Sequence, residues 1–295
     1  MEKLRVDLTK AIKLLEIVTE ELSTAGVTGQ YKSVFKGKGV EFDGYRVYAP
    51  DDDMSLIDWK ASTRAKQLVV KEFVEERNIN IFFLIDVSSS MVFGSTDKLK
   101  NEYAAEIVAS LSHVALEAGD KIGAALFSDK IIKNIPPSSS SNQFYILSRT
   151  LVNPTFYGGG YNIGEALKFL NNYLKEMSIV MVISDFIGLK EGWERYLGIA
   201  GKKFDVIGMM VRDPRDRSLP SDNTNMYLAD PLSKREMMVN PQLISREYKE
   251  HVKKEEEKIK AVFLSSGCSF INMSTDKPFA TSIINFFKRR QRRAR

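Results

Sequence analysis

Residues 79–85 form a short apolar run, rich in β-branched and aromatic side chains, that ends at Asp86, Ser88 and Ser90. A run of this kind is typical of a strand buried in a parallel sheet. Open α/β sheets place their ligands at the carboxyl ends of such strands. A carboxylate followed by two nearby hydroxyls puts three hard oxygen donors on one loop, a set that suits Mg²⁺ or Mn²⁺ and suits zinc poorly. The segment predicts a cation site, with capping of a following helix as the alternative.

Two later segments predict further polar loops at the same edge of the sheet. A second apolar run, residues 178–184, ends in a carboxylate, and a glycine-rich stretch between the two runs opens a helical segment. Because the carboxyl ends of parallel strands meet at one edge, these loops are expected to converge on the first one. The candidate residues that they add are Asp185, Gly159, Gly160, Tyr161 and Asn162.

This order of loops resembles the von Willebrand factor A domain and its metal-ion-dependent adhesion site. The resemblance implies that Asp86, Ser88 and Ser90 hold a metal ion and that Asp185 holds it indirectly. The family usually has a threonine in the middle loop, where this chain has Tyr161 and Asn162. A tyrosine hydroxyl lies too far from its backbone to replace threonine directly. We therefore expect the Asn162 amide oxygen or a water in that position, and a metal site that is weakened or lost.

The sequence ahead of the first strand extends the resemblance. Segments 44–50, 57–60 and 70–77 are similar to the prokaryotic family called domain of unknown function fifty-eight, whose members carry R-x-Y-x-P-G-D-D-x-R-x-I-D-W before such a domain. This chain departs from that motif at Asp51, which replaces glycine, and at Ser55, which replaces arginine. The resemblance implies an α/β, Rossmann-like von Willebrand factor A domain, with a mostly parallel sheet and helices on both faces, preceded by a small β-rich segment. It also implies action with a MoxR-type AAA+ ATPase in assembly or maturation of a protein complex.

Hydrophobic periodicity and turn residues divide the chain into four parts. We expect an N-terminal helix within residues 1–30 and a β-rich segment over 31–77. The α/β domain is expected over 78–287, with a hairpin insertion near 226–239, and a basic tail over 288–295. Within the large domain, strands and helices alternate, which by itself predicts a mainly parallel sheet covered on both faces.

An acidic cluster lies in the β-rich segment. Its residues include Asp52, Asp53 and Asp58. Such a cluster can bind a cation, but aspartates more often cap turns or pair with nearby cations, for which Arg64 and Lys66 are the candidates. The adjacent Trp59 is expected to be a packing anchor between segments.

Composition fits a globular protein that works inside the cell. The chain has 295 residues, 43% of them apolar, which is enough for a substantial core. The single Cys268 excludes an internal disulfide framework. No stretch approaches the roughly 20 apolar residues that a membrane span requires, and the N-terminus has no apolar signal core. We therefore expect a soluble, cytoplasmic protein without membrane insertion.

Positive charge is concentrated at the C-terminus. The net charge is +5, and six of the last eight residues are lysine or arginine. Such a run can bind nucleic acid, acidic lipid or an acidic partner. We favour a solvated extension of the last helix, because no aromatic residues that would stack on bases are interleaved with the cations.

Taken with the resemblance, these residues predict a non-enzymatic, divalent-cation-dependent protein–protein interaction module. A partner's Glu or Asp would complete the metal shell, with Tyr161, Gly159 and Gly160 lying beside it. One alternative is a metal-dependent phosphate-ester hydrolase of the Asp-x-Asp type, although Ser88 replaces the carboxylate that would act as its general acid. The other alternative is nucleic-acid binding through the basic tail.

Overall fold

The computed structural model describes residues 41–49, 52–74, 79–220, 225–230 and 235–294. The helix expected within residues 1–30 lies outside these ranges. Among the described helices, none is both long enough and apolar enough to cross a membrane.

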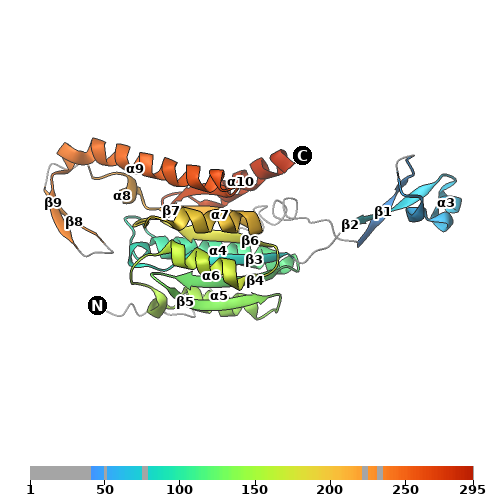
Figure 1. Cartoon of the computed structure of the whole chain (residues 1–295), viewed down its shortest axis with the longest axis horizontal. Coiled ribbons are helices and arrows are strands. Elements are labelled where there is room, and N and C mark those ends of the chain that lie inside the picture. The colour runs from blue at the N-terminus through green and yellow to red at the C-terminus, as the bar shows by residue number, and fades with distance from the viewer. Residues whose placement is uncertain (1–40, 50–51, 75–78, 221–224, 231–234, 295) are drawn as a thin grey trace.

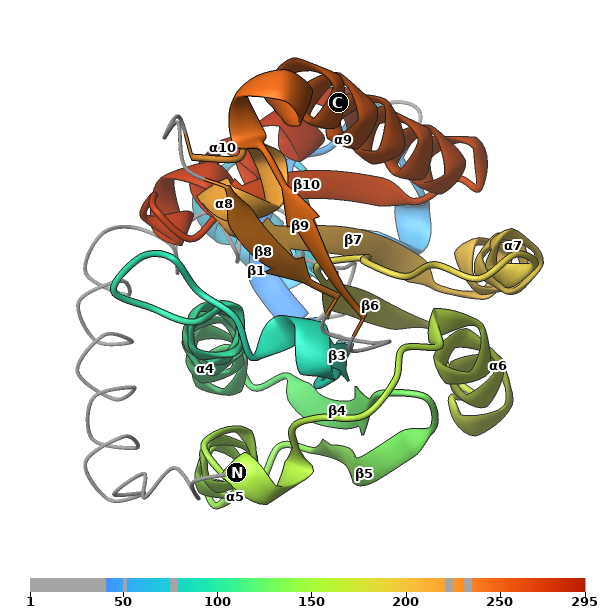
Figure 2. The same cartoon turned by 90° about the vertical axis from the view of Figure 1, so that its left-hand side faces the viewer.

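The body of the molecule is a six-stranded sheet in the order β10-β7-β6-β3-β4-β5 (Figures 1 and 2). Every neighbouring pair is parallel except β4 and β5. The mostly parallel α/β sheet predicted from the sequence is therefore confirmed. Its strands are β3 (Asn80–Asp86), β4 (Lys121–Phe127), β5 (Ile131–Ser138), β6 (Ser178–Ser184), β7 (Asp205–Arg212) and β10 (Ser269–Ser274).

Helices cover both faces of this sheet, as predicted. One apolar core lies under α4 (Lys100–Glu117), α5 (Gln143–Leu151) and α10 (Phe279–Ala294). The other lies under α6 (Ile163–Tyr173), α7 (Trp193–Lys203) and α9 (Pro241–Ser265). Successive residues of a strand point to opposite faces, so Phe83 enters the first core and Phe82 the second. Strand β3 is buried on both sides, which explains why its sequence is continuously apolar rather than alternating.

A smaller unit precedes the sheet and stands apart from it (Figure 1). Strands β1 (Glu41–Val47) and β2 (Val69–Val74) pair antiparallel, and helix α3 (Trp59–Ala65) lies between them in the sequence. The expected β-rich segment thus also contains a helix, which the sequence analysis missed. Helix α3 begins where the Asp58 side chain accepts a hydrogen bond from Ala61 N, and it ends at Lys66 in the left-handed conformation.

Trp59 is not the packing anchor that we expected. It is the first residue of α3 and remains 65% exposed. The helix is short, and its only buried residue is Ser62, so the described part of the structure places no core against the indole.

The acidic residues of the small unit cap turns and pair with cations. Asp53 accepts a hydrogen bond from Ser55 N, and Asp52 pairs with Arg46. Asp58 caps α3 and lies 3.4 Å from Lys71. Capping and pairing are therefore observed, but with Arg46 and Lys71 rather than the expected Arg64 and Lys66.

A short helix and a hairpin follow strand β7. The hairpin β8 (Met226–Ala229) and β9 (Glu236–Val239) lies where the sequence predicted one, whereas the short helix α8 (Pro214–Arg217) was not predicted. Helix α10 continues to Ala294, so the basic segment extends the last helix, which is the alternative that we favoured.

Helix α7 offers a matched test of how closely the core is packed. A Cβ at Gly201 would collide with the carbonyl oxygen of Ser266 and lie 2.8 Å from Cys268 Sγ, whereas a Cβ at Gly198 meets nothing within 4 Å. We expect Gly201→Ala to lower the free energy of unfolding by about 1–3 kcal/mol through overpacking. Gly198→Ala should raise it by up to about 1 kcal/mol, because alanine favours the helix. Urea unfolding of both variants tests this, and changes of the same sign would contradict it.

Candidate metal centre at the carboxyl edge of the sheet

Asp86 is the last residue of β3, and its carboxylate is fully buried. One oxygen, Oδ1, accepts a hydrogen bond of 2.8 Å from the backbone N–H of Ser88. The other, Oδ2, accepts one of 2.6 Å from the hydroxyl of Ser184, the last residue of the neighbouring strand β6. Both bonds fix the carboxylate at the edge of the sheet between its two central strands.

Ser88 and Ser90 present a pair of hydroxyl oxygens beside that carboxylate. Their Oγ atoms are 3.1 Å apart, and both side chains are buried. In an octahedral Mg²⁺ shell with ligands at about 2.1 Å, neighbouring ligands are about 3.0 Å apart. The spacing therefore suits two adjacent ligands of one cation. The serines do not cap a helix through their side chains: Ser88 precedes a 3-10 turn over Ser89–Met91 without a side-chain capping bond, and α4 begins only at Lys100. Asp86 accepts its bond from the backbone N–H of Ser88, directly before that turn.

Asp185 follows β6, and its carboxylate is already paired with a cation of the chain. Its Oδ2 lies 2.7 Å from Lys100 Nζ, and its Oδ1 accepts a hydrogen bond of 2.9 Å from Ile187 N. The same ammonium lies 2.9 Å from Asp216 Oδ2. Neither Lys100 nor Ser184 is among the residues predicted from the sequence. The neighbours of Lys100 include Lys98, Asn101 and Glu102, so no local pattern singles it out, and Ser184 is marked only by its position directly before Asp185.

The middle loop contributes Tyr161 in a way that we did not expect. The side chain is 2% exposed, packs near Phe127 and places its hydroxyl 3.2 Å from Ser184 Oγ. The hydroxyl thus reaches the group that holds Asp86. Burial, followed by the charge of Asp86, raises the Tyr161 pKa well above its usual value. Tyr161 therefore stays neutral and belongs to the interior of the site, not to an exposed partner-binding surface.

Asn162 does not direct its amide oxygen toward Asp86 in this structure. Its Oδ1 accepts a hydrogen bond of 3.3 Å from Glu165 N and caps α6. A capping asparagine at this position satisfies one of the free N–H groups of the first helical turn. The Asn162 amide oxygen is therefore used in helix capping and does not take the place of the threonine hydroxyl.

The glycine loop, residues 158–160, closes over the site. Gly158 N donates to Val87 O at 2.7 Å, and Ser89 N donates to Gly159 O at 3.1 Å. Gly158 and Gly159 have φ of 124° and 87°, a region that favours glycine. Beneath this loop, Asp86, Ser88, Ser90 and Asp185 are at most 1% exposed. The carboxyl end of β3 is therefore enclosed.

The surroundings of Asp86 disfavour its ionised form. Burial, and then the neighbouring Asp185, raise the pKa of Asp86 to about 7. A cation would relieve both causes by compensating the lost hydration and the repulsion. Among the described residues, no three His, Cys, Asp or Glu side chains gather into a metal-binding cluster. The predicted donor set therefore contains one carboxylate and two hydroxyls: Asp86, Ser88 and Ser90.

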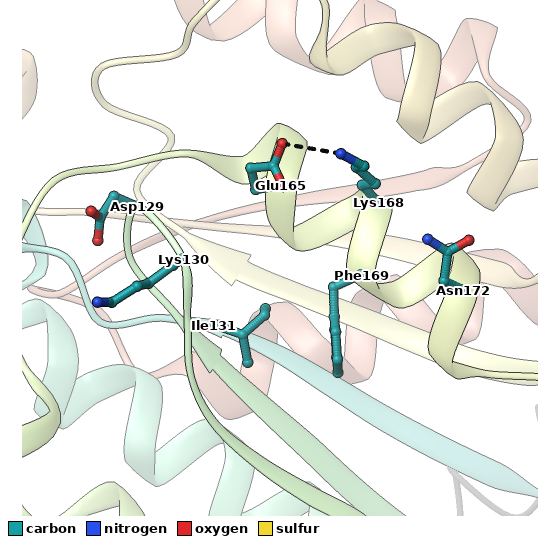
Figure 3. Close-up of a pocket in the computed structure, with 7 residues that line it drawn as sticks. All are labelled: Asp129, Lys130, Ile131, Glu165, Lys168, Phe169 and Asn172. Carbon is teal, nitrogen blue, oxygen red and sulfur yellow. Dashed lines mark ion pairs between the residues drawn. The ribbon is translucent and has the colours of Figure 1, made fainter.

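A separate pocket of about 300 Å³ lies between the turn after β4 and helix α6 (Figure 3). Its lining combines charged side chains with apolar ones, and Glu165 pairs with Lys168 at 3.6 Å on one wall. None of the residues predicted for the cation site lines it. The lining residues are Asp129, Lys130, Ile131, Glu165, Lys168, Phe169 and Asn172.

The sequence model of the family described as "Protein of unknown function DUF58" matches residues 44–258. The chain belongs to this family. Similar members include the uncharacterized protein Rv1480 of Mycobacterium tuberculosis, 23% identical over 97% of this chain and 91% of that protein. The uncharacterized protein YeaD of Bacillus subtilis is 37% identical, but over only 34% of this chain and 23% of its own length.

A solved structure of low sequence identity shares the fold of this chain. The conserved hypothetical protein BatB from Bacteroides thetaiotaomicron has a TM-score of 0.50 and 17% identity, covering 72% of this chain and 99% of its own. A von Willebrand factor type A structure from Catenulispora acidiphila has a TM-score of 0.40 and 11% identity, covering 76% of this chain and 44% of its own.

The raised pKa of Asp86 predicts a pH-dependent stability of the metal-free protein. Its folded pKa of about 7 lies above the ordinary 3.8, so the folded state binds a proton that the unfolded state releases between these values. Stability in chelator should therefore fall as the pH rises from about 4 to about 7 and level off above. Asp86→Asn lacks the titrating group. The difference between wild type and Asp86→Asn in thermal melts at several pH values measures the effect, and parallel curves would contradict it.

Proposed function

We propose that this protein is a non-enzymatic protein–protein interaction module of the von Willebrand factor A-like kind, and that it uses the carboxyl edge of its sheet. Asp86, Ser88 and Ser90 would hold Mg²⁺ or Mn²⁺ there. The observation that carries the proposal is the hydroxyl pair of Ser88 and Ser90, 3.1 Å apart beside a buried carboxylate. Without a cation the two hydroxyls hydrogen-bond to each other, and a bound cation would take a lone pair from each oxygen as two adjacent ligands.

A partner's Glu or Asp carboxylate would complete the cation's shell. In the enclosed conformation the glycine loop blocks the approach of the partner's carboxylate. Two backbone hydrogen bonds, Gly158 N to Val87 O and Ser89 N to Gly159 O, hold this loop to the segment that carries Ser88 and Ser90. Gly159 is exposed on the outer side of this loop. We therefore propose that the loop moves when the partner binds, and that Gly159 and Gly160 lie at the contact.

The surroundings of the edge suit a protein partner. Val92 and Phe93, on the loop after Ser90, are 38% and 40% exposed. In Figure 2 the hairpin β8–β9 crosses in front of β7 and ends in front of β6. Its Tyr227 and Met238 are 72% and 59% exposed. Aromatic residues and methionine are enriched in protein–protein interfaces and adapt well to a partner's surface.

Two further parts of the proposal rest on the family and on composition. A MoxR-type AAA+ ATPase as partner, acting in assembly or maturation of a protein complex, follows from the family resemblance. A cytoplasmic location follows from the use of a single cysteine. The basic end of α10 has a structural use, since Arg290 pairs with Asp205, so we assign it no nucleic-acid function.

Cation binding should stabilise the folded protein. A ligand at a hundredfold excess over its Kd adds about 2.7 kcal/mol to the free energy of unfolding. Millimolar Mg²⁺ or Mn²⁺ should therefore raise the melting temperature of the wild type by several degrees over that in chelator. Asp86→Asn should lose this response, whereas Glu257→Ala, at a carboxylate on α9 whose side chain is 67% exposed, should keep it. A response that survives Asp86→Asn would place the cation elsewhere.

Partner binding should depend on the same carboxylate. We expect a purified MoxR-type AAA+ ATPase from the same source to bind the wild type in Mg²⁺, and binding to fall at least tenfold in chelator or with Asp86→Asn. Deletion of residues 288–295 should change the affinity little, because exposed cations contribute mainly a salt-screened attraction. Biolayer interferometry measures all three. If the deletion abolishes binding and Asp86→Asn does not, the basic segment is the interaction element instead.

A further inference from the structure

Lys100 is the one buried cation in contact with the predicted metal residues in the described part of the structure. Its side chain is 1% exposed, and its ammonium lies 2.7 Å from Asp185 Oδ2 and 2.9 Å from Asp216 Oδ2. The ring of Phe93 lies 5.6 Å from the same nitrogen. Three different parts of the carboxyl edge therefore meet at one positive charge: the start of α4, the end of β6 and helix α8.

This position is unfavourable for a lysine unless its charge is needed there. Lys100 is the first residue of α4, where the positive end of the helix dipole repels a cation. Full burial of an ammonium costs several kcal/mol before its ion pairs are counted. The two carboxylates offset both costs. One of them, Asp216 Oδ2, also accepts a hydrogen bond from Asp213 N, which closes the first turn of α8.

We propose that Lys100 is a resident cation of this site, which neutralises Asp185 in place of a divalent metal. The ammonium and its two carboxylates keep the loops in position without any bound ion. Asp185 is then satisfied by the chain itself, so a divalent cation relies on Asp86, Ser88 and Ser90 alone. The role of these three residues rests on the proposed function, whereas the role of Lys100 does not.

The charge of Lys100 also limits how tightly a second cation can bind. An ammonium near a divalent ion repels it, and the low dielectric of a buried site strengthens this repulsion. Removal of the ammonium would leave Asp185 with an uncompensated buried charge, which a divalent ion could then neutralise. In a variant without this lysine, the stability of the folded protein should thus depend more strongly on bound metal.

Lys100→Ala tests the inference, with Lys98→Ala as the matched control. Lys98 lies two residues earlier, pairs with Glu106 and has a side chain that is 45% exposed. In chelator we expect Lys100→Ala to melt several degrees below the wild type. In titration calorimetry with Mn²⁺ alone it should bind about tenfold more tightly than the wild type, the order expected when one unit charge is removed near a divalent ion. Lys98→Ala should match the wild type in Mn²⁺ affinity.

The outcomes separate this inference from the proposed function. If Lys100→Ala binds Mn²⁺ tightly and the wild type binds none, the resident cation is supported and the cation-dependent function fails. If the wild type binds Mn²⁺ through Asp86 and Lys100→Ala binds it no more tightly, the inference is overturned and the function stands. If neither protein binds Mn²⁺, the inference is also overturned. Should Lys100→Ala fail to fold with or without Mn²⁺, Lys100→Gln, which keeps most of the chain length and removes the charge, decides by the same measurement.

Discussion

The carboxylate of Asp86 lies at the end of the central strand with no exposed surface, and the loops around it are arranged to compensate for that burial. A buried carboxylate without partners would be costly. Here its two oxygens accept hydrogen bonds from Ser88 N and from Ser184 Oγ. Ser184 in turn contacts the hydroxyl of Tyr161 and accepts a hydrogen bond from Phe186 N. Three loops that are distant in the sequence are thereby tied to one side chain.

Much of the fold could be predicted from the sequence because its signals are local. Continuous apolar runs such as 79–85 and the helical spacing of the segments between them identify the strands and helices of the sheet without any knowledge of their partners. Helix α3 escaped because it has almost no apolar face and buries only Ser62. Its signals were the capping Asp58 and the stop at Lys66, which are weaker than periodicity. Trp59 was misjudged because large aromatic residues usually pack inside, and this one is exposed.

The candidate site could be predicted only in part, because its residues meet through long-range contacts. Asp86, Ser88 and Ser90 lie on one loop and are recognisable by spacing alone. Lys100 is 85 residues away from Asp185 in the sequence, and a lysine in the first turn of an amphipathic helix would ordinarily face solvent. The reach of the Tyr161 hydroxyl depended on the path of the glycine loop, which places the ring against Phe127 and directs its oxygen to Ser184. No local pattern fixes such a path.

A lysine and a divalent metal differ in what they require from the cell. The ammonium of Lys100 is part of the chain, so its local concentration is fixed by folding and does not depend on the supply of ions. A metal must instead shed water and reach a site that the glycine loop covers. A protein that keeps Asp185 neutral with its own lysine can therefore hold the carboxyl edge in one arrangement before any ion or partner arrives. A partner can open this edge only if it binds the opened arrangement more tightly than the enclosed one. The reason is that a ligand shifts an equilibrium between two states only by the difference in its affinity for them. The exposed hairpin β8–β9 and the loop at Val92 and Phe93 offer apolar contacts outside the enclosed site from which that difference can come.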